Sequence, residues 1–348
     1  MLRSLMKKHC AATLGIGFMA VLAGCASTSE EPESPTARQA MRFGVKIDES
    51  RAIVSNATLN ADGASFSVWS TFSRNDEEQT VAPLLLFDGE TVTRSEGTWS
   101  YANTQYWFPK FTYYFVGVYP SGATGVSDYK FEDNRLSFDF TYPTDYTNTP
   151  DLLTATHTRL YLEENDNSDA VTLGFTHILS RLNFVCTVDP VVQEGMTINR
   201  LTIRNINTKG SYAIAPSDLT GAALETNDFT GGEWIASTSG EISIPLETLI
   251  AGGTTKSFFS DGANALMIIP QTVPADVEVE VAYTVGGESK TVTAKLHDTT
   301  VNAHEGVWKK GRSYSYSFAL TDNEKINFTS PTIQDWNEAE GGNYIIIN

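Results

Sequence analysis

The chain has 348 residues, of which 41% are hydrophobic and 11% aromatic, and its formal net charge is −18. At roughly 100–200 residues per domain, this length suggests two domains. The apolar content excludes a largely disordered chain. The strong negative charge, with no basic stripe to offset it, argues against nucleic acid as a partner.

Residues 1–24 have the pattern of a bacterial lipoprotein signal peptide. A positively charged head precedes an apolar run over residues 11–22. That run is too short for a membrane-spanning helix, which needs about 20 residues. It ends in Leu-Ala-Gly-Cys, which resembles the lipobox, in which the cysteine is acylated and becomes the mature N-terminus. We therefore expect a lipid on Cys25 that anchors the chain to a membrane. The alternative is an ordinary secretory signal.

Residues 25–41 are predicted to form a flexible tether. The segment is polar and acidic, and Pro32 and Pro35 interrupt it. Such a composition does not bury enough apolar surface to fold, so we expect the tether to hold the folded part away from the membrane.

From Phe43 onward, apolar residues recur mainly at every second position, which is typical of strands with one buried face. The clearest cases are residues 65–72, 84–87, 111–119, 135–142, 159–162, 182–188, 201–206, 241–246, 265–269, 277–285, 290–296 and 313–320. In the last of these, Tyr314, Tyr316, Phe318 and Leu320 alternate with serine and alanine. Only residues 176–182 and 216–224 suggest short helices.

Strands of this kind, joined by turn-rich loops, favour antiparallel sandwiches. The sequence predicts an all-β fold with an N-terminal β-sandwich domain over residues 42–175 and a C-terminal one over residues 176–348. The boundary follows the polar segment 163–170, which is a natural place for a break.

Motifs for catalysis or cofactor binding are absent from the sequence. It contains no His-Glu-x-x-His, no Gly-x-Ser-x-Gly and no glycine-rich phosphate loop. The histidines show no ligand spacing for a metal ion, and Cys186 is the single cysteine left after Cys25 and the signal. We expect no cofactor, no metal and no enzymatic activity. Aromatic residues such as Trp99, Tyr101 and Trp107 could stack on a sugar, but core packing is the simpler use for them.

Several segments, taken together in order, resemble the fimbrillin family, the subunits of the lipoprotein-derived pili of Bacteroidales. They are the lipobox at Cys25, "MRFGVKIDESRA" (41–52), "FTHILSRLNFVCTV" (175–188), "ALMIIPQTV" (265–273), "WKKGRSYSYSFAL" (308–320) and "IQDWNE" (333–338). Each is weak alone, but the set spans nearly the whole chain.

The resemblance implies two tandem transthyretin-like β-sandwich domains with few short helices, and a structural role as an outer-membrane lipoprotein exported to the cell surface. It also implies an assembly mechanism. An Arg-directed protease cuts within or just after the first N-terminal strand, that strand leaves, and a C-terminal strand of the next subunit fills the vacated groove. The partners are then other pilus subunits, self or related, through donor strand exchange, and the fimbria supports cell adhesion.

Two places in the sequence suit the cut and the donor strand. The leaving strand would be 42–47 or 52–59, with Arg42 or Arg51 as the cut site. Arg51 is preferred because it separates a polar stretch from a resumed apolar run. The candidate donor strand is the tail 333–348, which contains Ile333, Trp336, Tyr344, Ile345, Ile346 and Ile347.

Three alternatives remain open at this point. The tail can instead be the last strand of its own sheet. The protein can be an anchor or tip subunit that is not cleaved. It can also be a monomeric surface lipoprotein that binds a glycan or host ligand through exposed aromatic side chains.

Overall fold

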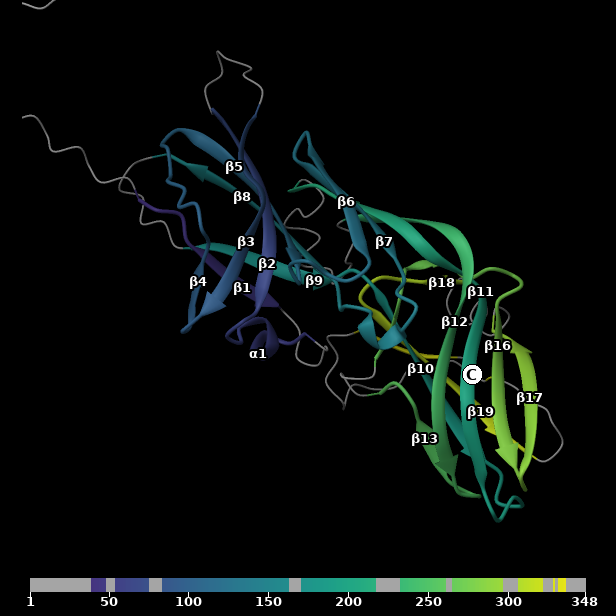
Figure 1. Ribbon diagram of the computed structural model, residues 1–348. Helices are drawn as coiled ribbons and strands as arrows, with labels where there is room; N and C mark the ends of the chain where they lie inside the picture. The colour runs from purple at the N-terminus through teal and green to yellow at the C-terminus, as the bar shows by residue number, and fades with distance from the viewer. Residues whose placement is uncertain are drawn as a thin grey trace, which may run out of the picture. The chain divides into compact units, whose positions relative to one another are not determined.

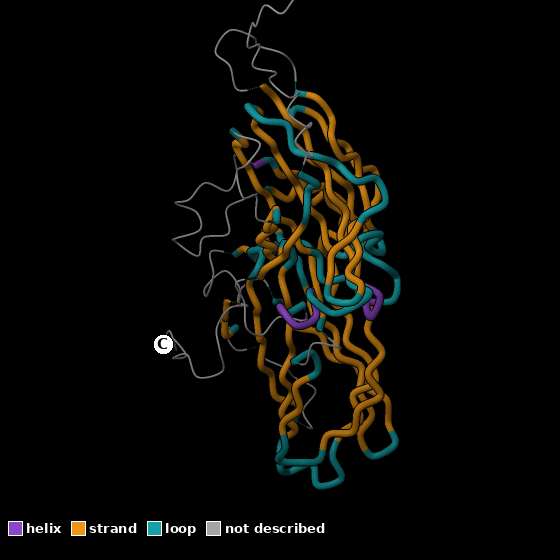
Figure 2. The backbone as a smooth tube through the Cα atoms, turned by 90° about the vertical axis from the view of Figure 1, so that its left-hand side faces the viewer, coloured by secondary structure: helices purple, strands orange, loops and turns teal. Residues whose placement is uncertain are grey.

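The computed structural model describes residues 39–47, 54–74, 83–162, 170–216, 232–260, 265–296, 306–321, 328 and 331–335. Within these ranges nearly all regular structure is β-strand (Figure 2). The helices described are short: α1 at Asn56–Leu59 and the 3-10 helix η1 at Tyr146–Asn148. The predicted all-β class is confirmed.

The first sheet consists of strands from the first half of the chain. Its order among the described residues is β1-β9-β8-β5-β2-β3-β4 (Figure 1). The bounds are β1 Phe43–Ile47, β2 Ser65–Arg74, β3 Leu84–Ser95, β4 Thr98–Ser100, β5 Phe111–Tyr119, β8 Leu153–Tyr161 and β9 Val171–His177. The edge pair β1–β9 is parallel, whereas the others are antiparallel. Parallel strands need a long connection, and here that connection forms the rest of the sheet.

This sheet curls around a core made of its own strands. The segment just before β1 meets the segment just after β4, where Ala40 and Tyr106 form a bridge. The enclosed core contains Met41, Phe43, Ile47, Leu59, Phe66, Val68, Phe87, Val92, Trp99, Trp107, Tyr113, Phe115, Leu153, Tyr161, Val171, Leu173 and Phe175. The chain entering β1 therefore closes a gap between two edges of one sheet.

Two further sheets contain most of the remaining strands. One has the order β13-β10-β19-β20 with β14 on β10, and the other has the order β17-β16-β11-β7-β6 with β12 on β11. The bounds are β6 Val126–Glu132, β7 Arg135–Thr141, β10 Ser180–Val188, β11 Met196–Ile214, β12 Glu233–Ile250, β13 Thr255–Ser257, β14 Leu266–Ile268, β16 Glu278–Val285, β17 Glu288–Lys295, β19 Arg312–Leu320 and β20 Thr332–Asp335. A short pair, β15 Gln271–Thr272 and β18 Val307–Trp308, completes the set. Like β1–β9, the pair β10–β19 is parallel.

The long hairpin of β11 and β12 links two hydrophobic cores. Along one edge of β11, the first part pairs with β16 and the last part with β7. Along its other edge, β11 pairs with β12 over most of its length. Near β16 it packs with β10 and β19 in one core. Near β7 it packs with Trp69, Val116 and Val118 of the first sheet in another. One sheet thus contains strands from both sides of residue 175, and the predicted domain boundary there stays a prediction.

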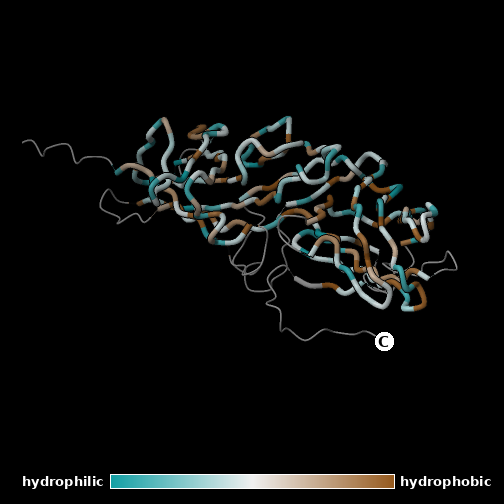
Figure 3. The backbone as a smooth tube through the Cα atoms, turned by 60° about the horizontal axis from the view of Figure 1, so that its bottom comes forward, coloured by the Kyte–Doolittle hydropathy of each residue, from teal (hydrophilic) through white to brown (hydrophobic). Residues whose placement is uncertain are grey.

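The alternating pattern of β19 is explained by its position. Tyr314, Tyr316, Phe318 and Leu320 are all buried in the core, whereas Ala319 is exposed. Figure 3 shows short brown and teal stretches interspersed along the backbone tube. The strands predicted at 277–285 and 290–296 form a hairpin, in which β16 and β17 pair up to Val285 and Glu288 across Gly286 and Gly287.

Two local predictions are wrong. Residues 176–182 are not helical, because β9 ends at His177 and β10 begins at Ser180. The leaving-strand alternative 52–59 is not a strand at Asn56–Leu59, which is helix α1. In the first case, β9 and β10 are each hydrogen-bonded to other strands of their sheets. This pairing outweighs the local helical pattern. In the second, Ser55 caps the helix, and its side chain accepts a hydrogen bond from the Thr58 amide.

A short motif that the sequence did not reveal occurs twice. In each copy a buried tryptophan, Trp107 or Trp308, precedes a turn with positive φ and then a buried tyrosine, Tyr113 or Tyr314. The Tyr113 hydroxyl accepts from the Phe108 amide at 2.7 Å, and the Tyr314 hydroxyl accepts from the Lys309 amide at 2.7 Å. Burial raises the pKa of both tyrosines to about 12, so both hydroxyls stay neutral and able to donate.

The turn residues of the two copies allow a matched test of backbone strain. Lys110 has φ +67° and Gly311 has φ +65°. Left-handed backbone costs a side-chain-bearing residue about 1 kcal/mol relative to glycine. We expect Lys110→Gly to raise the free energy of unfolding by up to about 1 kcal/mol, and Gly311→Ala to lower it by about 1 kcal/mol or more, as measured by urea denaturation. A loss of stability in Lys110→Gly would contradict this account.

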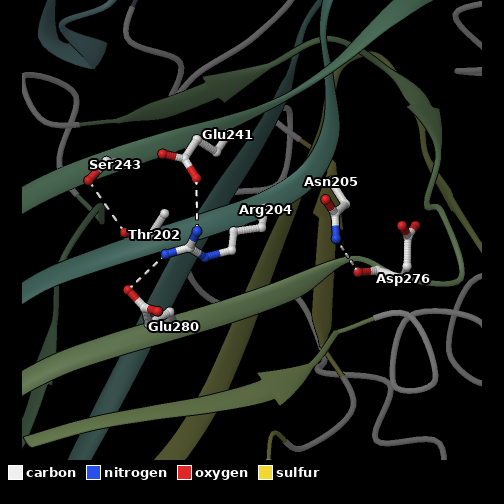
Figure 4. A network of polar contacts seen from close by, with 7 residues as sticks. All are labelled: Thr202, Arg204, Asn205, Glu241, Ser243, Asp276 and Glu280. Carbon is white, nitrogen blue, oxygen red and sulfur yellow. Dashed lines mark hydrogen bonds and ion pairs between the residues drawn. The ribbon is translucent and has the colours of Figure 1, made fainter.

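A polar network on the third sheet helps to set the register of three strands (Figure 4). The Arg204 guanidinium of β11 lies 3.1 Å from Glu241 of β12 and 3.0 Å from Glu280 of β16. The Thr202 and Ser243 hydroxyls beside it are 3.3 Å apart. The Arg204 and Glu241 side chains are 40% and 54% exposed and Glu280 is 20% exposed, so solvent screens these pairs and the network contributes little to stability.

Candidate functional site

The candidate site is the slot in the first sheet that residues 39–47 occupy. β1 pairs with the edge strand β9 from Phe43 opposite Val171 to Ile47 opposite Phe175. Just before β1, the Met41 amide donates to Gln105 O at 2.8 Å, and the Trp107 amide donates to Gln39 O at 3.1 Å. The segment is therefore hydrogen-bonded to β9 through one part of its length and to the segment 105–107 through the other.

The side chains of the segment fill the core of the first sheet. Met41, Phe43 and Ile47 are all at most 5% exposed. The Phe43 ring is surrounded by aromatic rings at centroid distances of 5.8 Å (Phe66), 5.7 Å (Phe87), 5.5 Å (Tyr101) and 6.2 Å (Phe115). Removing the segment would expose both these apolar slots and a row of backbone hydrogen-bonding groups.

A side-chain clamp ends β1. The Ile47 amide donates to Asn56 Oδ1 at 2.9 Å, and Asn56 Nδ2 donates back to the Ile47 carbonyl. One asparagine thus satisfies both backbone groups of the last strand residue, as a neighbouring strand would. Sequence analysis missed Asn56, and its position next to the Ser55 cap was the only signal available.

A buried hydrogen-bonded pair, Asp151 and His177, holds the chain at Val54, just before helix α1. The Val54 amide donates to Asp151 Oδ2 at 3.2 Å, and His177 Nδ1 lies 2.7 Å from Asp151 Oδ1. Both side chains are essentially inaccessible to solvent. The pair is therefore closed to a substrate and serves to attach the segment after β1 to the ends of β8 and β9. No motif in the sequence pointed to it.

The two candidate cut sites differ in what they would release. Arg42 is exposed and directly precedes β1. Cleavage after Arg42 would leave Phe43–Ile47 on the protein, whereas cleavage after Arg51 would separate the whole of β1 from it. Arg51 itself lies outside the described residues, as does Cys25.

Of the predicted donor residues, Ile333 is described. It lies in β20, partly buried against the core of β10 and β19, and is paired with Tyr314. In this monomer the start of the tail is thus an edge strand of its own sheet. Trp336, Tyr344, Ile345, Ile346 and Ile347 lie outside the described residues.

The aromatic side chains considered for sugar stacking are mostly internal. Trp107 is 2% exposed and packs on Tyr161, while Trp99 is buried beside Phe66.

The pKa of His157 is lowered, mainly because the ring is buried and to a smaller extent because the positive charge of Arg159 is near. In the described ranges, no group of three or more His, Cys, Asp or Glu is placed to hold a metal ion. None of the helices described there is long and apolar enough to cross a membrane.

The fold and the slot together define an all-β protein of sandwich type whose first strand is an edge strand. The sequence matches the fimbrillin-like family over residues 50–336. The chain belongs to this family, so the resemblance noted in the sequence is confirmed. No curated protein matches it.

Solved structures give the same fold. A fimbrial protein from Bacteroides vulgatus is similar at 16% identity and a TM-score of 0.57, covering 85% of this chain and 99% of that one. A candidate cell adhesion protein from Bacteroides ovatus is similar at 15% identity and a TM-score of 0.52, covering 87% and 99%. At these identities the likeness establishes the fold alone.

Proposed function

We propose that the protein is a structural subunit of a cell-surface fimbria that supports adhesion. It assembles when cleavage after Arg51 releases the N-terminal strand and the tail of another subunit takes its place. Membership of the fimbrillin-like family supports the class of protein. The observation that carries the mechanism is β1, an edge strand whose side chains fill the core of the sheet and whose loss would open a slot for a strand.

The energetics favour replacement of the strand over an empty slot. Burying a large apolar side chain is worth about 1.5–3 kcal/mol, and the segment buries three of them, at positions 41, 43 and 47. Each buried backbone group left unpaired costs about 1–3 kcal/mol. A donated strand would fill the apolar slots and pair the backbone groups again, as in β-strand complementation. Because the contact is head-to-tail, it does not close on itself and generates a fibre.

The donor strand in this proposal is the part of the predicted tail 333–348 that follows β20 and contains Tyr344–Ile347. Because Ile333 pairs with Tyr314 in the chain's own sheet, we assign the donor role to the residues after 335. The precursor would be exported as an outer-membrane lipoprotein with its lipid on Cys25, and an Arg-directed protease would act on it at the cell surface. The role is structural rather than enzymatic.

The test is controlled cleavage followed by size analysis. Treating the purified chain with an arginine-specific protease is expected to yield a ladder of multimers by size-exclusion chromatography. Arg51→Ala should remain monomeric, whereas the matched variant Arg42→Ala should assemble like the wild type. If cut protein that has lost β1 stays monomeric, or if Arg51→Ala assembles at the normal rate, the mechanism is wrong.

A peptide makes the test specific to the slot. A peptide with the sequence of residues 39–47 should compete with the donor strand and stop assembly of the cut protein. The same peptide with Phe43→Ser should compete poorly, because it loses the ring that the surrounding aromatic side chains contact. Equal inhibition by both peptides would show that the slot is not the acceptor.

The runner-up function, a monomeric lipoprotein that binds a glycan by aromatic stacking, has less support because Trp99 and Trp107 are buried. An uncleaved anchor or tip subunit uses the same fold. It would be recognised in the cleavage experiment by an intact N-terminal strand.

A further inference from the structure

The strand in the slot is hydrogen-bonded along both of its edges. On one side, five residue pairs join β1 to β9, and the Val171 amide donates to Arg42 O at 2.8 Å. On the other side, the Met41 carbonyl accepts from the Tyr101 hydroxyl at 3.0 Å, in addition to the two main-chain bonds with the segment 105–107. The occupant of the slot is therefore enclosed between two edges of the curled sheet, and it leaves only when both rows of bonds break.

The two edges of the slot run in opposite directions. β9 is parallel to β1, whereas Ala40 and Tyr106 form an antiparallel bridge. Bonds between parallel strands are slanted and evenly spaced, and bonds between antiparallel strands are perpendicular and alternate between close and wide pairs. A strand inserted the other way round would exchange these two patterns, so its side chains would no longer meet the apolar slots in register with its bonds. The slot therefore fits a strand that runs in the direction of β1.

The second half of the chain is attached at the Ile47 end of the slot. Ile47 lies opposite Phe175, two residues before β9 ends. Only residues 178–179 separate β9 from β10 (Figure 1). The other end of the slot, at Gln39, therefore points away from this attachment.

The connection between β9 and β10 is fixed by hydrogen bonds. The Ile178 amide donates to Leu152 O at 3.0 Å, and the Ile178 carbonyl accepts from Trp234 Nε1 at 2.6 Å. The Leu179 carbonyl accepts from the Gly311 amide at 2.8 Å. Both connecting residues are fully buried. A force applied to the second half of the chain is therefore transmitted to β9 instead of being taken up by a loose linker.

The side chains in the slot oppose sliding along its axis. A shift by one residue would turn the buried Met41, Phe43 and Ile47 toward solvent. A shift by two would put Val45 among the four aromatic rings that surround Phe43. When the strand is pulled along its axis from its N-terminal end, these contacts and both rows of bonds bear the force together. When it is lifted from its C-terminal end, they break one after another, beginning with the Asn56 clamp.

We infer that the slot is a directional junction, which holds a strand parallel to β9 and resists tension applied at the N-terminal end of that strand. This rests on the proposed fimbrial function and adds the orientation of the partner to it. A donor strand that follows the body of its subunit is attached to that body through its N-terminal end. The donor subunit then lies at the Gln39 end of the slot, and tension along the fibre loads the junction in its strong direction.

Force spectroscopy on the uncut chain, starting at Ala26, tests the junction without cleavage or a donor. One handle is fixed at Leu249→Cys, an exposed residue near the end of β12, and the other at Arg42→Cys or Lys46→Cys, which are exposed at the two ends of β1. Release of β1 frees up to about 40 Å of chain before Val54 from position 42, and about 25 Å from position 46. The release force at one loading rate should be at least twofold higher through position 42. Equal forces, or a higher force through position 46, would overturn the inference.

The clamp provides a matched pair of variants for this measurement. Asn56→Ala should lower the release force through position 46 more than through position 42, because lifting the strand from its C-terminal end loads the clamp first. Asn60→Ala removes a side chain that donates to the Asn56 carbonyl and has no bond to β1, so it should change neither force. A larger effect of Asn56→Ala through position 42 would contradict the inference.

The orientation of the partner is measured on the chain cut after Arg51. A peptide of residues 336–348 with a quencher at its N-terminus is added to cut chain that has a fluorophore at Thr104→Cys or at Ala57→Cys, which are exposed near the two ends of the slot. The native Cys186 is buried and does not compete for the label. Quenching should be stronger at position 104 than at position 57.

The outcomes separate this inference from the function on which it rests. Stronger quenching at position 57 would overturn the orientation alone and leave the tail as donor. If a peptide of residues 39–47 with the same quencher binds and the tail peptide does not, both the proposed donor and the orientation are wrong. Binding of neither peptide would overturn the strand-exchange mechanism itself.

Discussion

Replacing Phe43 with alanine is expected to lower the free energy of unfolding by about 3–5 kcal/mol, the usual range for truncating a buried phenylalanine. The ring is 5% exposed and lies within 6.2 Å of four other aromatic rings. Its loss leaves a cavity in the centre of the first core, whose walls belong to several paired strands and cannot simply collapse. Urea denaturation followed by tryptophan fluorescence measures the change.

The control for this variant is Arg42→Ala, one position earlier on the same segment. Arg42 is exposed, so its truncation should change stability by no more than about 0.5 kcal/mol. If Phe43→Ala costs less than about 1 kcal/mol, residues 39–47 are not an integral part of the sheet. The slot would then have no energetic reason to accept a replacement strand.

Replacing Asp151 with alanine is also expected to lower the free energy of unfolding, by about 2–6 kcal/mol, because it leaves two buried hydrogen-bonding groups without their partner, at about 1–3 kcal/mol each. The carboxylate accepts from the Val54 amide and contacts His177 Nδ1 at 2.7 Å. Both groups would lose that acceptor without access to water. We expect the variant also to admit protease more readily around residue 54, because the bond that fixes this segment is gone.

Two further variants distinguish the effect of removing the Asp151 carboxylate charge from the effect of removing side-chain atoms. Asp151→Asn keeps one acceptor oxygen and should cost less than the alanine variant. Asp139→Ala removes an exposed carboxylate that accepts from Ser211 at 2.6 Å, and should change stability by no more than about 0.5 kcal/mol. Equal losses in Asp151→Ala and Asp139→Ala would mean that the buried pair is not a structural anchor.

Much of the β structure could be predicted because its signal is local. A period of two reports which side chains face a core, and the strand predicted at 111–119 coincides with β5. The same holds for the four inward residues of β19. The local signal failed at residues 176–182, where a short apolar run fits a helix as well as two strand ends.

Only part of the candidate site could be predicted from the sequence. An apolar segment near Phe43 and a following arginine suggested a strand that could be removed. β1 pairs with β9, but in the chain the other strands of the first sheet lie between them. The parallel direction of this pair has no local signature in the sequence. Asn56, Asp151 and His177, which attach the ends of the segment, are ordinary polar residues until the fold brings them together.

By itself, the sequence determined the all-β class, most of the strands and the family, because alternation of apolar residues and short ordered motifs are properties of neighbouring positions. Only the tertiary structure decided that residues 39–47 close a gap between two edges of one sheet and that Trp107 is internal. These features depend on contacts between residues far apart in the chain, and the energies that select them come from burial and hydrogen bonding across the sheets rather than from local preference.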